Sequence, residues 1–408
     1  MNREFDVVVG GAGTIGTVAA ALLVARGHCA PGRVALIAER LPQAGFDRDW
    51  DLRVFALSRA SQRLLEACGV WQRIRADRIC QYERMCIWDA NGAADAAGSL
   101  QFDCAEIGEP NLGSIVDGRE LQWRCLEAAR AAGVVVIEAG IDTAVCGDAE
   151  VRVRLSDGRE LAGQLLLAAD GTDSKIRNLL HIGTAGHAYD QDALVAHVRT
   201  SKPHRHTAWQ RFLATGPLAF LPLPDGRSSI VWSVARDQAA RLRALDASAF
   251  AGALDQAGGE VLGRSEIATT VASFPLRLQY AMDYVRPRVA LLGDAAHVVH
   301  PLAGQGLNLG LLDCAALIEV LGDAEDARAF GDMRLLRRYE RRRRSENLLA
   351  AAAFDGLDRL FSNADPALSG LRAAGLGLVG RSRFLRRRFA ERALGLSGDA
   401  PAFLRSRP

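Results

Sequence analysis

The sequence lacks the features that would place it outside the ordinary globular proteins. Lysine occurs only at Lys175 and Lys202, so arginine carries almost all of the positive charge of the 408 residues. The formal net charge of +2 gives no reason to expect nucleic acid as a partner. The eight cysteines include no CxxC pair, which disfavours a zinc site or a disulfide framework and favours reduced thiols. With 49% hydrophobic and 24% charged residues, a disordered or coiled-coil chain is also excluded.

One uncharged run, from Val7 to Ala25, imitates a membrane span. It contains four glycines, and the charge of Arg3 before it is offset by Glu4 and Asp6. These features disfavour a signal peptide or a transmembrane helix and favour a buried strand, a glycine turn and a buried helix. We therefore expect a cytoplasmic protein, with peripheral contact at the inner membrane face as the one form of membrane attachment left open.

The N-terminal region has the pattern of a dinucleotide-binding unit. A β-branched strand leads into Gly11, Gly13 and Gly16, spaced as GxGxxG, and then into an alanine-rich helix. Gly11 permits a tight turn, Gly13 leaves room for a pyrophosphate, and Gly16 lets the helix close against the strand. The next strand, 34–38, ends at Glu39, whose carboxylate can accept hydrogen bonds from an adenosine ribose. FAD and NAD share this half-site, so these residues alone leave the dinucleotide open.

Two later strands end in an aspartate. The buried run 165–169 leads into Asp170, and the run 289–292 leads through a glycine into Asp294. A glycine-spaced loop follows, and then a helix expected over 311–321. The backbone amides of such a loop can point at a ligand, with the helix dipole behind them.

Between these strands the pattern changes to short β-rich segments. They lie at 193–199, 207–212, 218–221 and 229–234. We expect them to form an antiparallel sheet over the ligand, followed by one helix at 239–257, with 82–88 as an edge piece. Their apolar side chains would line the ligand, and core packing alone is the alternative explanation for most of these residues.

Together the motifs resemble the aromatic-ring hydroxylases, the single-component FAD monooxygenases with the para-hydroxybenzoate hydroxylase fold. Within that family the likeness is to the ubiquinone-biosynthesis hydroxylases, most of all to 2-polyprenylphenol hydroxylase. The specific residues are the N-terminal glycine motif, Asp170-Gly171, and the run from Gly293 to Gly310 that contains HPLAGQGLNLG. Further matching segments are 51–58, 210–212, 216–218 and 336–341, so the resemblance covers nearly the whole chain.

The resemblance implies an α/β fold with three parts. They are a Rossmann-like FAD-binding domain, an inserted antiparallel-sheet substrate domain and a C-terminal helical segment. The expected boundaries are 1–75, 110–180 and 276–330 for the FAD-binding domain, 76–109 and 181–275 for the substrate domain, and 331–408 for the helical segment.

The resemblance also implies which residues bind FAD. They are Gly11, Gly13, Gly16, Glu39, Arg53, Gln122, Asp170, Asp294, Gly306, Leu307 and Asn308. The glycines would hold the pyrophosphate, Glu39 the adenosine ribose, and Asp294 the ribityl hydroxyls. Arg53 and Gln122 would contact the phosphate and ribityl region, and Asp170 would lie near the pyrophosphate and influence NAD(P)H use. One departure from the family pattern is Asp117-Gly118, where a Glu-Asn pair is usual.

The loop from Pro301 to Asn308 is the expected catalytic element. Pro301, Gly304, Gln305 and Gly306 would position the edge of the flavin, and the backbone amides from Gly304 to Asn308 would stabilise negative charge on the reduced ring. His297 and His300, three residues apart, invite a metal interpretation. No carboxylate or thiol motif with ligand spacing accompanies them, so we predict no metal site.

The activity implied by the resemblance is hydroxylation of a polyprenylphenol ring in ubiquinone biosynthesis. FAD would react with O2 through a C4a-hydroperoxide, with NADH or NADPH as the electron donor, because amino-acid side chains supply neither the electrons nor a route past the spin barrier of O2. Other ubiquinone-biosynthesis proteins are expected partners. The alternatives are an isoprenoid double-bond reductase and a non-enzymatic flavoprotein scaffold.

The region after Gly331 is helical and strongly basic. Arginines cluster at 334–344 and again at 381–388. Such runs are usually a solvated face, and the functional alternative is a surface that meets anionic lipid headgroups or partner proteins.

Overall fold

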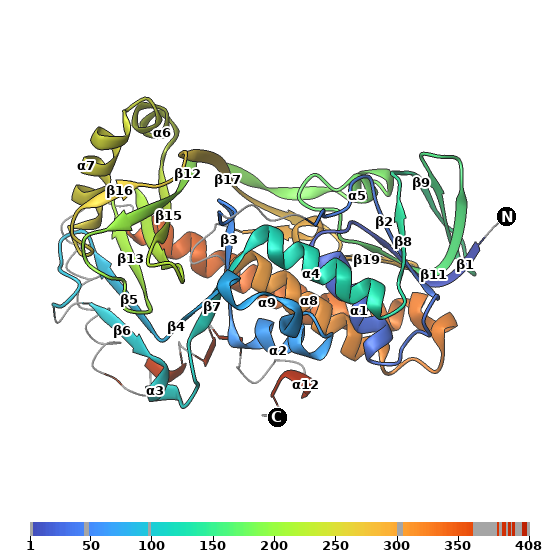
Figure 1. The fold of residues 1–408 in the computed structure, drawn as a ribbon. Coiled ribbons are helices and arrows are strands. Elements are labelled where there is room, and N and C mark those ends of the chain that lie inside the picture. Colours follow the sequence, from blue (N-terminus) through green and yellow to red (C-terminus); the bar gives the residue numbers. More distant parts are fainter. Residues whose placement is uncertain are drawn as a thin grey trace.

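The computed structural model describes residues 3–44, 49–96, 99–299 and 305–361, with short pieces at 382, 386–388, 391–392, 394–395 and 402–405. Three sheets organise this part of the chain (Figure 1). Pro301 and Gly304, both predicted to act on the flavin edge, lie outside the described residues, as does His300.

The first sheet is built on five parallel strands in the order β19-β11-β1-β2-β8. They are β1 (Arg3–Gly10), β2 (Val34–Ala38), β8 (Val135–Glu138), β11 (Glu160–Ala168) and β19 (Val289–Leu291). β18 (Val285–Arg286) extends one edge antiparallel, and β9 (Ile141–Cys146) and β10 (Val151–Leu155) form an antiparallel extension of β11. Because neighbouring parallel strands share a direction, the loops after β1, β2, β11 and β19 all lie at one edge.

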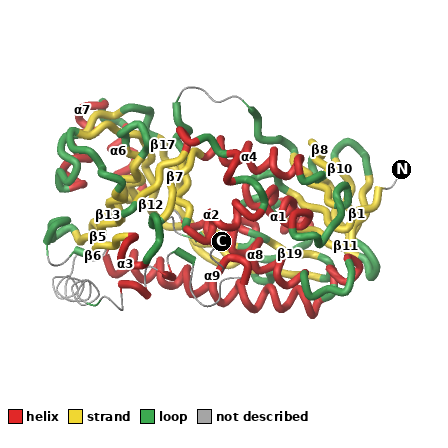
Figure 2. Tube along the Cα trace, turned by 60° about the horizontal axis from the view of Figure 1, so that its bottom comes forward, coloured by secondary structure: helices red, strands yellow, loops and turns green. Residues whose placement is uncertain are grey.

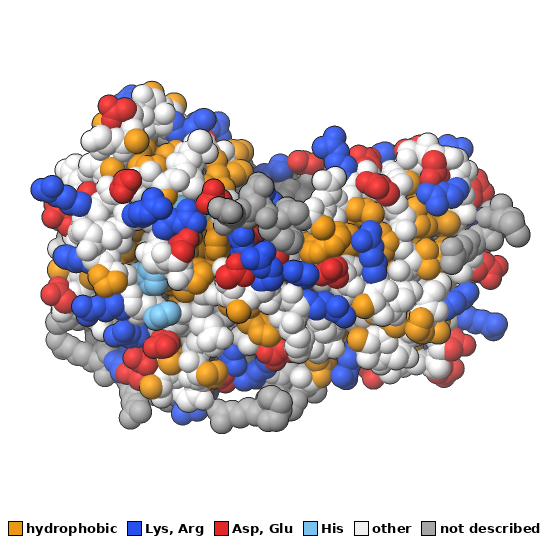
Figure 3. All heavy atoms as spheres, in the orientation of Figure 1, with side chains coloured by type: hydrophobic (Ala, Val, Ile, Leu, Met, Phe, Trp, Pro, Cys, Tyr) orange, Lys and Arg blue, Asp and Glu red, His pale blue; other side chains and the backbone are white. Residues whose placement is uncertain are grey.

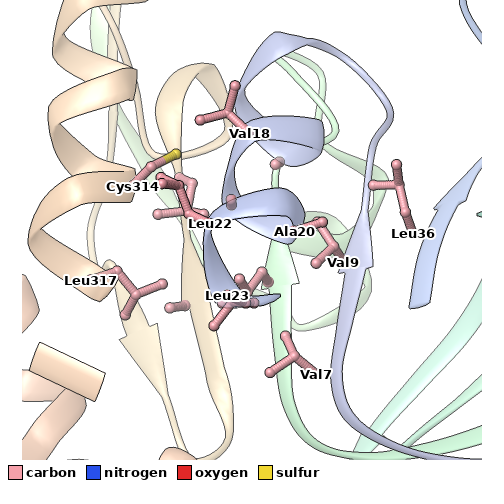
Figure 4. Packing of buried hydrophobic residues seen from close by; sticks show 14 of the residues in the cluster. Val7, Val9, Val18, Ala20, Leu22, Leu23, Leu36, Cys314 and Leu317 are labelled. Carbon is pink, nitrogen blue, oxygen red and sulfur yellow. The ribbon is translucent and has the colours of Figure 1, made fainter. Parts of the chain in front are cut away.

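Helices cover this sheet and form the main core with it. α1 (Thr14–Ala25) contacts α4 (Gly118–Ala131) and α8 (Gln305–Leu321). Figure 4 shows Val7 and Val9 of β1, Leu22 and Leu23 of α1 and Leu317 of α8 within the same cluster. The uncharged N-terminal run is therefore a strand, a turn and a helix inside a protein core, as expected.

A small sheet connects the two larger ones. It consists of β3 (Val54–Leu57), β7 (Gly113–Asp117) and β4 (Ile79–Tyr82), and it is antiparallel throughout. α2 (Arg59–Ala67) follows β3, α3 (Cys104–Ile107) precedes β7, and α5 (Lys175–Leu179) follows β11.

The third sheet has nine strands in the order β20-β17-β12-β15-β14-β13-β5-β6, with β16 also paired to β12. Its strands are β5 (Arg84–Asp89), β6 (Leu100–Asp103), β12 (Thr184–Thr200), β13 (Thr207–Leu213), β14 (Gly216–Pro222), β15 (Ser228–Ala235), β16 (Ser265–Ile267), β17 (Ala272–Ala281) and β20 (His297–Val298). The expected antiparallel sheet is present with one exception, because β5 pairs with β13 in parallel. The segment 82–88, expected as an edge piece, is divided between two sheets. Its first residue ends β4 of the small sheet, and residues 84–88 lie in β5 of the third sheet, where β6 and not β5 is the edge strand.

The single helix expected at 239–257 is wrong. The structure has α6 (Arg236–Arg243) and α7 (Ala247–Gly258), which lie together on one side of the third sheet (Figure 1). The chain breaks at Asp246, whose carboxylate accepts a hydrogen bond from the Ala249 N–H at 2.8 Å and so begins a new helix.

The long helix α9 (Met333–Phe361) extends along the molecule, as the view in Figure 2 shows. It contacts α8 and β18 in the first sheet region and β14 in the third sheet. A short helix, α12 (Ala402–Arg405), lies against α2. No helix in the described part of the chain combines the length and apolarity that crossing a membrane requires.

The cysteines and surface charges agree with the composition. All eight cysteines are free in the structure, and seven of them are buried. On the face shown in Figure 3, acidic and basic side chains are interspersed, as the small net charge leads one to expect.

Candidate functional site

The turn between β1 and α1 depends on two close backbone approaches. Gly11 has φ of 108°, and a Cβ atom there would lie 2.3 Å from the carbonyl oxygen of Ala169. A Cβ atom on Gly16 would lie 1.9 Å from the Gly11 carbonyl oxygen. Both contacts are with backbone atoms, so the tight turn and the close helix packing expected from these two glycines are confirmed.

Gly13 differs from its two neighbours in the motif. It is exposed, has an ordinary φ of −70°, and a Cβ atom there would have no described atom within 4 Å. It is the N-cap residue of α1 and has no side chain to cap the first turn, so the N–H groups of that turn face outward. The hydroxyl of the next residue, Thr14, is buried and has no hydrogen-bond partner among the described residues. Open space, free amides and an unpartnered hydroxyl together fit a diphosphate.

Glu39 lies where β2 ends, at the same edge of the sheet. Its side chain is 70% exposed, and the Nζ atom of Lys175, at the start of α5, lies 3.8 Å from one of its carboxylate oxygens. The carboxylate is therefore accessible to a ligand that extends from the glycine turn. This position matches the predicted ribose-binding role.

Asp170, at the end of β11, uses its carboxylate within its own turn. One oxygen accepts a hydrogen bond from the Ser174 hydroxyl at 2.5 Å, and the other accepts one from the Ile176 N–H at 3.0 Å. The side chain therefore fixes the turn that leads into α5. Asp170 can therefore influence a bound cofactor through the shape of this turn.

Asp294 lies in the single turn η3 (Gly293–Ala295) that follows β19. It is half-buried, and the Thr172 hydroxyl lies 3.3 Å from its carboxylate, so the turns after β11 and β19 meet. A Cβ atom on Gly310 of α8 would lie 3.1 Å from the Gly293 Cα atom. The start of α8 is thus packed directly against the turn that carries Asp294.

The glycine-spaced loop was expected to end before a helix at Leu311, and this boundary is wrong. α8 already includes Gln305, so Gln305, Gly306 and Leu307 lie in its first turn, each half-buried. First-turn amides of a helix have no partner within the helix, so their expected role toward a negatively charged ring edge is retained.

Asn308 uses its side chain to join α8 to the small sheet. Its oxygen accepts hydrogen bonds from the Ser58 N–H at 2.9 Å and the Ser61 hydroxyl at 2.7 Å. Its amide nitrogen donates to the Ala56 carbonyl at 2.8 Å. The side chain is therefore structural, and a contact of Asn308 with the cofactor stays a prediction.

Arg53 and Gln122 are less strongly constrained. Arg53 is exposed just before β3, and its guanidinium lies over the Phe55 ring at 5.1 Å. Gln122 is half-buried on α4. The two segments do meet, because the Gly118 N–H donates to the Arg53 carbonyl at 3.0 Å.

The unusual Asp117-Gly118 pair has a structural reason. The Asp117 carboxylate caps α4 by accepting from the Glu120 N–H at 3.1 Å, and it also accepts from the Asp51 N–H at 2.8 Å. A Cβ atom on Gly118 would lie 2.5 Å from the Arg53 carbonyl oxygen. This departure from the family pattern therefore holds Asp51 and Arg53 against α4.

Comparison with known proteins places these features in a family. The family described as FAD binding domain matches residues 4–352. The 3-demethoxyubiquinol 3-hydroxylase of Escherichia coli (strain K12) is 34% identical over 403 residues, covering 97% of this chain and 100% of the relative. The chain belongs to the FAD-dependent monooxygenases.

Other comparisons agree with this family. The human ubiquinone biosynthesis monooxygenase COQ6, mitochondrial, is 32% identical, covering 92% of this chain and 89% of the relative. Among solved structures, p-nitrophenol 4-monooxygenase PnpA from Pseudomonas putida DLL-E4 has a TM-score of 0.76 at 18% identity and covers 100% of both chains. The expected α/β class with a Rossmann-like FAD-binding fold is confirmed.

The residues of this monooxygenase fit FAD. The α1 amides and Gly13 would hold the diphosphate, Glu39 the adenosine ribose, Asp294 the ribityl chain, and the first turn of α8 the flavin edge. These groups come from loops at the same edge of one sheet, as nucleotide binding requires. When bound, FAD supplies the redox chemistry that the side chains lack, and NAD(P)H is the usual electron donor in this family.

One buried polar group was not predicted as part of the site. Asp313, in the middle of α8, is completely buried and accepts from the Gly293 N–H at 3.1 Å. It also contacts the His297 ring at 2.5 Å, the Arg343 guanidinium at 2.8 Å and the Asn347 amide at 3.1 Å. The network ties the turn that carries Asp294 to α8 and α9, so it determines where the flavin-binding loops lie.

The charges of this network explain its protonation state. Burial raises the pKa of Asp313, but the opposing effects of His297 and Arg343 are larger and lower it to about 2. Asp313 is therefore an anion at neutral pH, and Arg343 belongs to the core although the basic run was expected to be a solvated face. A sequence signal was present, since Asp313 is the only charged residue between Gln305 and Ile318. His297, which invited a metal interpretation, has Asp313 as its partner, and the described residues contain no cluster of three metal-type ligands.

Proposed function

We propose that this monooxygenase hydroxylates the aromatic ring of a polyprenylphenol intermediate in ubiquinone biosynthesis, with O2 and NADH or NADPH. The observation that carries the proposal is the similarity along the whole chain to proteins named as ubiquinone hydroxylases. Besides the Escherichia coli relative, ubiquinone hydroxylase UbiL of Rhodospirillum rubrum is 35% identical over 414 residues, covering 100% of this chain and 94% of the relative.

The structure supports different roles for the two large sheets, with FAD bound at the first and the substrate at the third. The first sheet offers the FAD-binding loops, and the third sheet presents an apolar face toward the small sheet, where Ala219, Leu221 and Val231 pack near Ala56 and Ile115. Apolar surroundings of this kind would suit a prenylated ring and would exclude water, which otherwise lets the reduction of O2 end in hydrogen peroxide. The same side chains orient the ring, while Asp294 and the first turn of α8 position the flavin.

The choice of ring carbon belongs to the same proposal. The resemblance of the sequence motifs to 2-polyprenylphenol hydroxylase leads us to propose 2-polyprenylphenol as the substrate. One relative is named as a 3-demethoxyubiquinol 3-hydroxylase, so 3-demethoxyubiquinol is the substrate to compare with it.

Complementation tests this function. The chain is expressed in bacterial strains that each lack one ring-hydroxylation step, and ubiquinone and its precursors are identified by mass. We expect ubiquinone to return in the strain lacking the first hydroxylation. Recovery of ubiquinone in a different strain would show that the substrate is the intermediate of that other hydroxylation step. Recovery in none of the strains would contradict the function.

The mass of the product separates this function from the alternatives. A hydroxylase adds one oxygen atom to the prenylated phenol, whereas an isoprenoid reductase adds two hydrogen atoms. A non-enzymatic flavoprotein scaffold would leave the phenol unchanged and would not consume NAD(P)H with O2.

Peripheral membrane contact is a further part of the proposal. On α9, Leu348 and Leu349 are 37% and 54% exposed, shortly after Arg341 and Arg344. Basic side chains beside exposed leucines suit a surface that meets anionic headgroups, through which a lipid-soluble phenol enters. Sedimentation with vesicles tests this: we expect binding to anionic vesicles that Leu349→Glu weakens, and equal recovery with neutral vesicles would contradict it.

A further inference from the structure

Two buried polar side chains on the third sheet have no evident structural task. His197 of β12 and Ser229 of β15 are both 0% exposed. Neither ring nitrogen of His197, nor the hydroxyl of Ser229, has a hydrogen-bond partner of good geometry among the described residues. Burying such groups without partners is unfavourable, so a sheet that retains them calls for a reason.

Strand pairing places the two side chains next to each other. His197 is directly opposite Ser229 in the antiparallel pair β12–β15, and Ser229 is directly opposite Leu221 in the pair β14–β15. Directly opposite residues lie on the same face of a sheet, so the three side chains form a row across three strands.

This row lies on the face that is turned toward the small sheet. Two residues further along β15, Val231 packs with Leu221 against Ala56 and Ile115 of the small sheet. His197 also makes a hydrogen-bonding contact with the Leu52 backbone, one residue before Arg53. The row therefore faces the segment that carries Arg53, a predicted FAD-binding residue.

The neighbouring positions on this face are apolar and incompletely covered. Val195 on β12 and Val231 on β15 are opposite each other, and both are only half-buried although their strands lie inside the sheet. The polar pair His197–Ser229 therefore adjoins a partly exposed apolar surface. An apolar surface that ends in two hydrogen-bonding groups matches a prenylated aromatic ring with a hydroxyl group.

The protonation state of His197 suits this ligand. Burial, and next the positive charge of Arg227, lower the pKa of His197 to about 4, against smaller opposing effects of Asp225, the Leu52 backbone and Asp117. At neutral pH the ring is uncharged and has one nitrogen that accepts a hydrogen bond.

We propose that His197 and Ser229 bind the ring hydroxyl of the phenolic substrate, with His197 accepting the hydrogen bond that the hydroxyl donates. This inference rests on the proposed function, because it takes a phenol as the substrate. A hydroxyl held by an acceptor is a more electron-rich ring substituent than a free one, so the contact orients the ring and favours oxygen transfer to it. It also gives a well-aligned partner to two buried polar groups that have none among the described residues.

The test compares two ligands that differ by one hydrogen-bond donor. The holoenzyme is titrated with 2-geranylphenol and with its methyl ether, and binding is followed through the visible spectrum of FAD. We expect the wild-type protein to bind the phenol about tenfold more tightly than the ether, the scale of one hydrogen bond to a buried acceptor.

Three variants and one control test whether His197 and Ser229 cause the preference for the phenol over its methyl ether. His197→Leu is expected to abolish the preference by weakening binding of the phenol alone, His197→Gln to restore part of it, and Ser229→Ala to reduce it about threefold. His187→Gln is the matched control, since His187 is on the same strand but exposed. We expect it to leave the preference unchanged.

The possible failures are distinguishable. If His197→Leu keeps both FAD and the full preference for the phenol, the inference is wrong while the hydroxylase function stands. If His197→Leu loses FAD, Ser229→Ala decides, and an unchanged preference in that variant overturns the inference. If the wild-type holoenzyme binds neither ligand, the proposed phenolic substrate fails, and this inference fails with it.

Discussion

At the scale of single residues, exposure separates ligand-type side chains from structural ones. Glu39 is accessible at the sheet edge, whereas the side chains of Asp170 and Asn308 form hydrogen bonds within the protein. The sequence predicted the aspartates and glutamate at the strand ends because their positions follow from the strand pattern. It could not predict how Asp170 and Asn308 use their side chains, because those partners depend on the fold around them.

Glu39→Ala should weaken FAD binding without destabilising the protein. Loss of a charged hydrogen-bond acceptor for the ribose weakens binding by about 1–3 kcal/mol. Glu138→Ala is the control, because Glu138 is exposed at the end of the neighbouring strand β8, opposite Ala38. Titration of the apoprotein with FAD measures both variants, and equal affinity of wild type and Glu39→Ala would remove Glu39 from the site.

His197 should make the protein less stable in mild acid. Its pKa is about 4 in the folded protein against an ordinary value of 6.5. Between these values the unfolded chain binds more protons than the folded one, so the free energy of unfolding falls as the pH is lowered from 6.5 to 4. Denaturant unfolding at several pH values checks this, and the fall should be shallower in His197→Gln. The same slope in both proteins would show that the pKa of His197 is not lowered.

At the scale of elements, the sequence predicted the glycine turns better than the helix ends. A Cβ atom at Gly11 or Gly16 would collide with backbone atoms, so both positions require glycine. A requirement of this local kind is visible in the sequence as a motif. The break at Asp246 and the start of α8 before Leu311 were missed. The start of α7 depends on capping by Asp246, and the first turns of α8 pack against the turn at Gly293, neither of which apolar periodicity reveals.

Gly13→Ala and Gly16→Ala should change different properties, FAD binding in the first case and stability of the apoprotein in the second. Gly13 has open space at its Cβ position, so Gly13→Ala should leave the apoprotein as stable as wild type but weaken FAD binding at least tenfold, because the methyl group enters the diphosphate position. Gly16→Ala forces a Cβ atom onto the Gly11 carbonyl and should destabilise the apoprotein by about 1–3 kcal/mol. Thermal unfolding without FAD, followed by FAD titration, separates the two effects. Normal FAD affinity in Gly13→Ala would contradict the diphosphate assignment.

Asp313→Asn should be much more damaging than a similar change on the surface. It leaves Arg343 without its buried charged partner, which typically costs about 3–5 kcal/mol. Asp323→Asn removes an exposed ion pair with Arg338, which lies on α9 like Arg343. This change should lower the free energy of unfolding by less than about 1 kcal/mol. Chemical unfolding measures both, and similar losses in the two variants would show that the buried network is not a main link between α8 and α9.

At the scale of the whole molecule, the order of the chain brings together loops that are far apart in sequence. Loops after β1, β2, β11 and β19 meet at one edge, and the third sheet presents His197, Ser229 and apolar side chains on the face turned toward the small sheet beside them. The sequence predicted this arrangement through its strand-end motifs and its family resemblance. The Asp313 and Arg343 contact, between residues 30 positions apart, and the row His197–Ser229–Leu221 emerge only when the strands and helices are placed in space.

The most direct measurement follows the oxygen atom. The FAD-loaded protein is supplied with NADH or NADPH, a prenylated phenol and isotopically heavy molecular oxygen, and the product is examined by mass spectrometry. The account predicts a hydroxylated phenol that carries one heavy oxygen atom, formed with consumption of the nicotinamide and dependent on FAD. A product without heavy oxygen, or oxidation of the nicotinamide that leaves the phenol intact and yields only hydrogen peroxide, would contradict it.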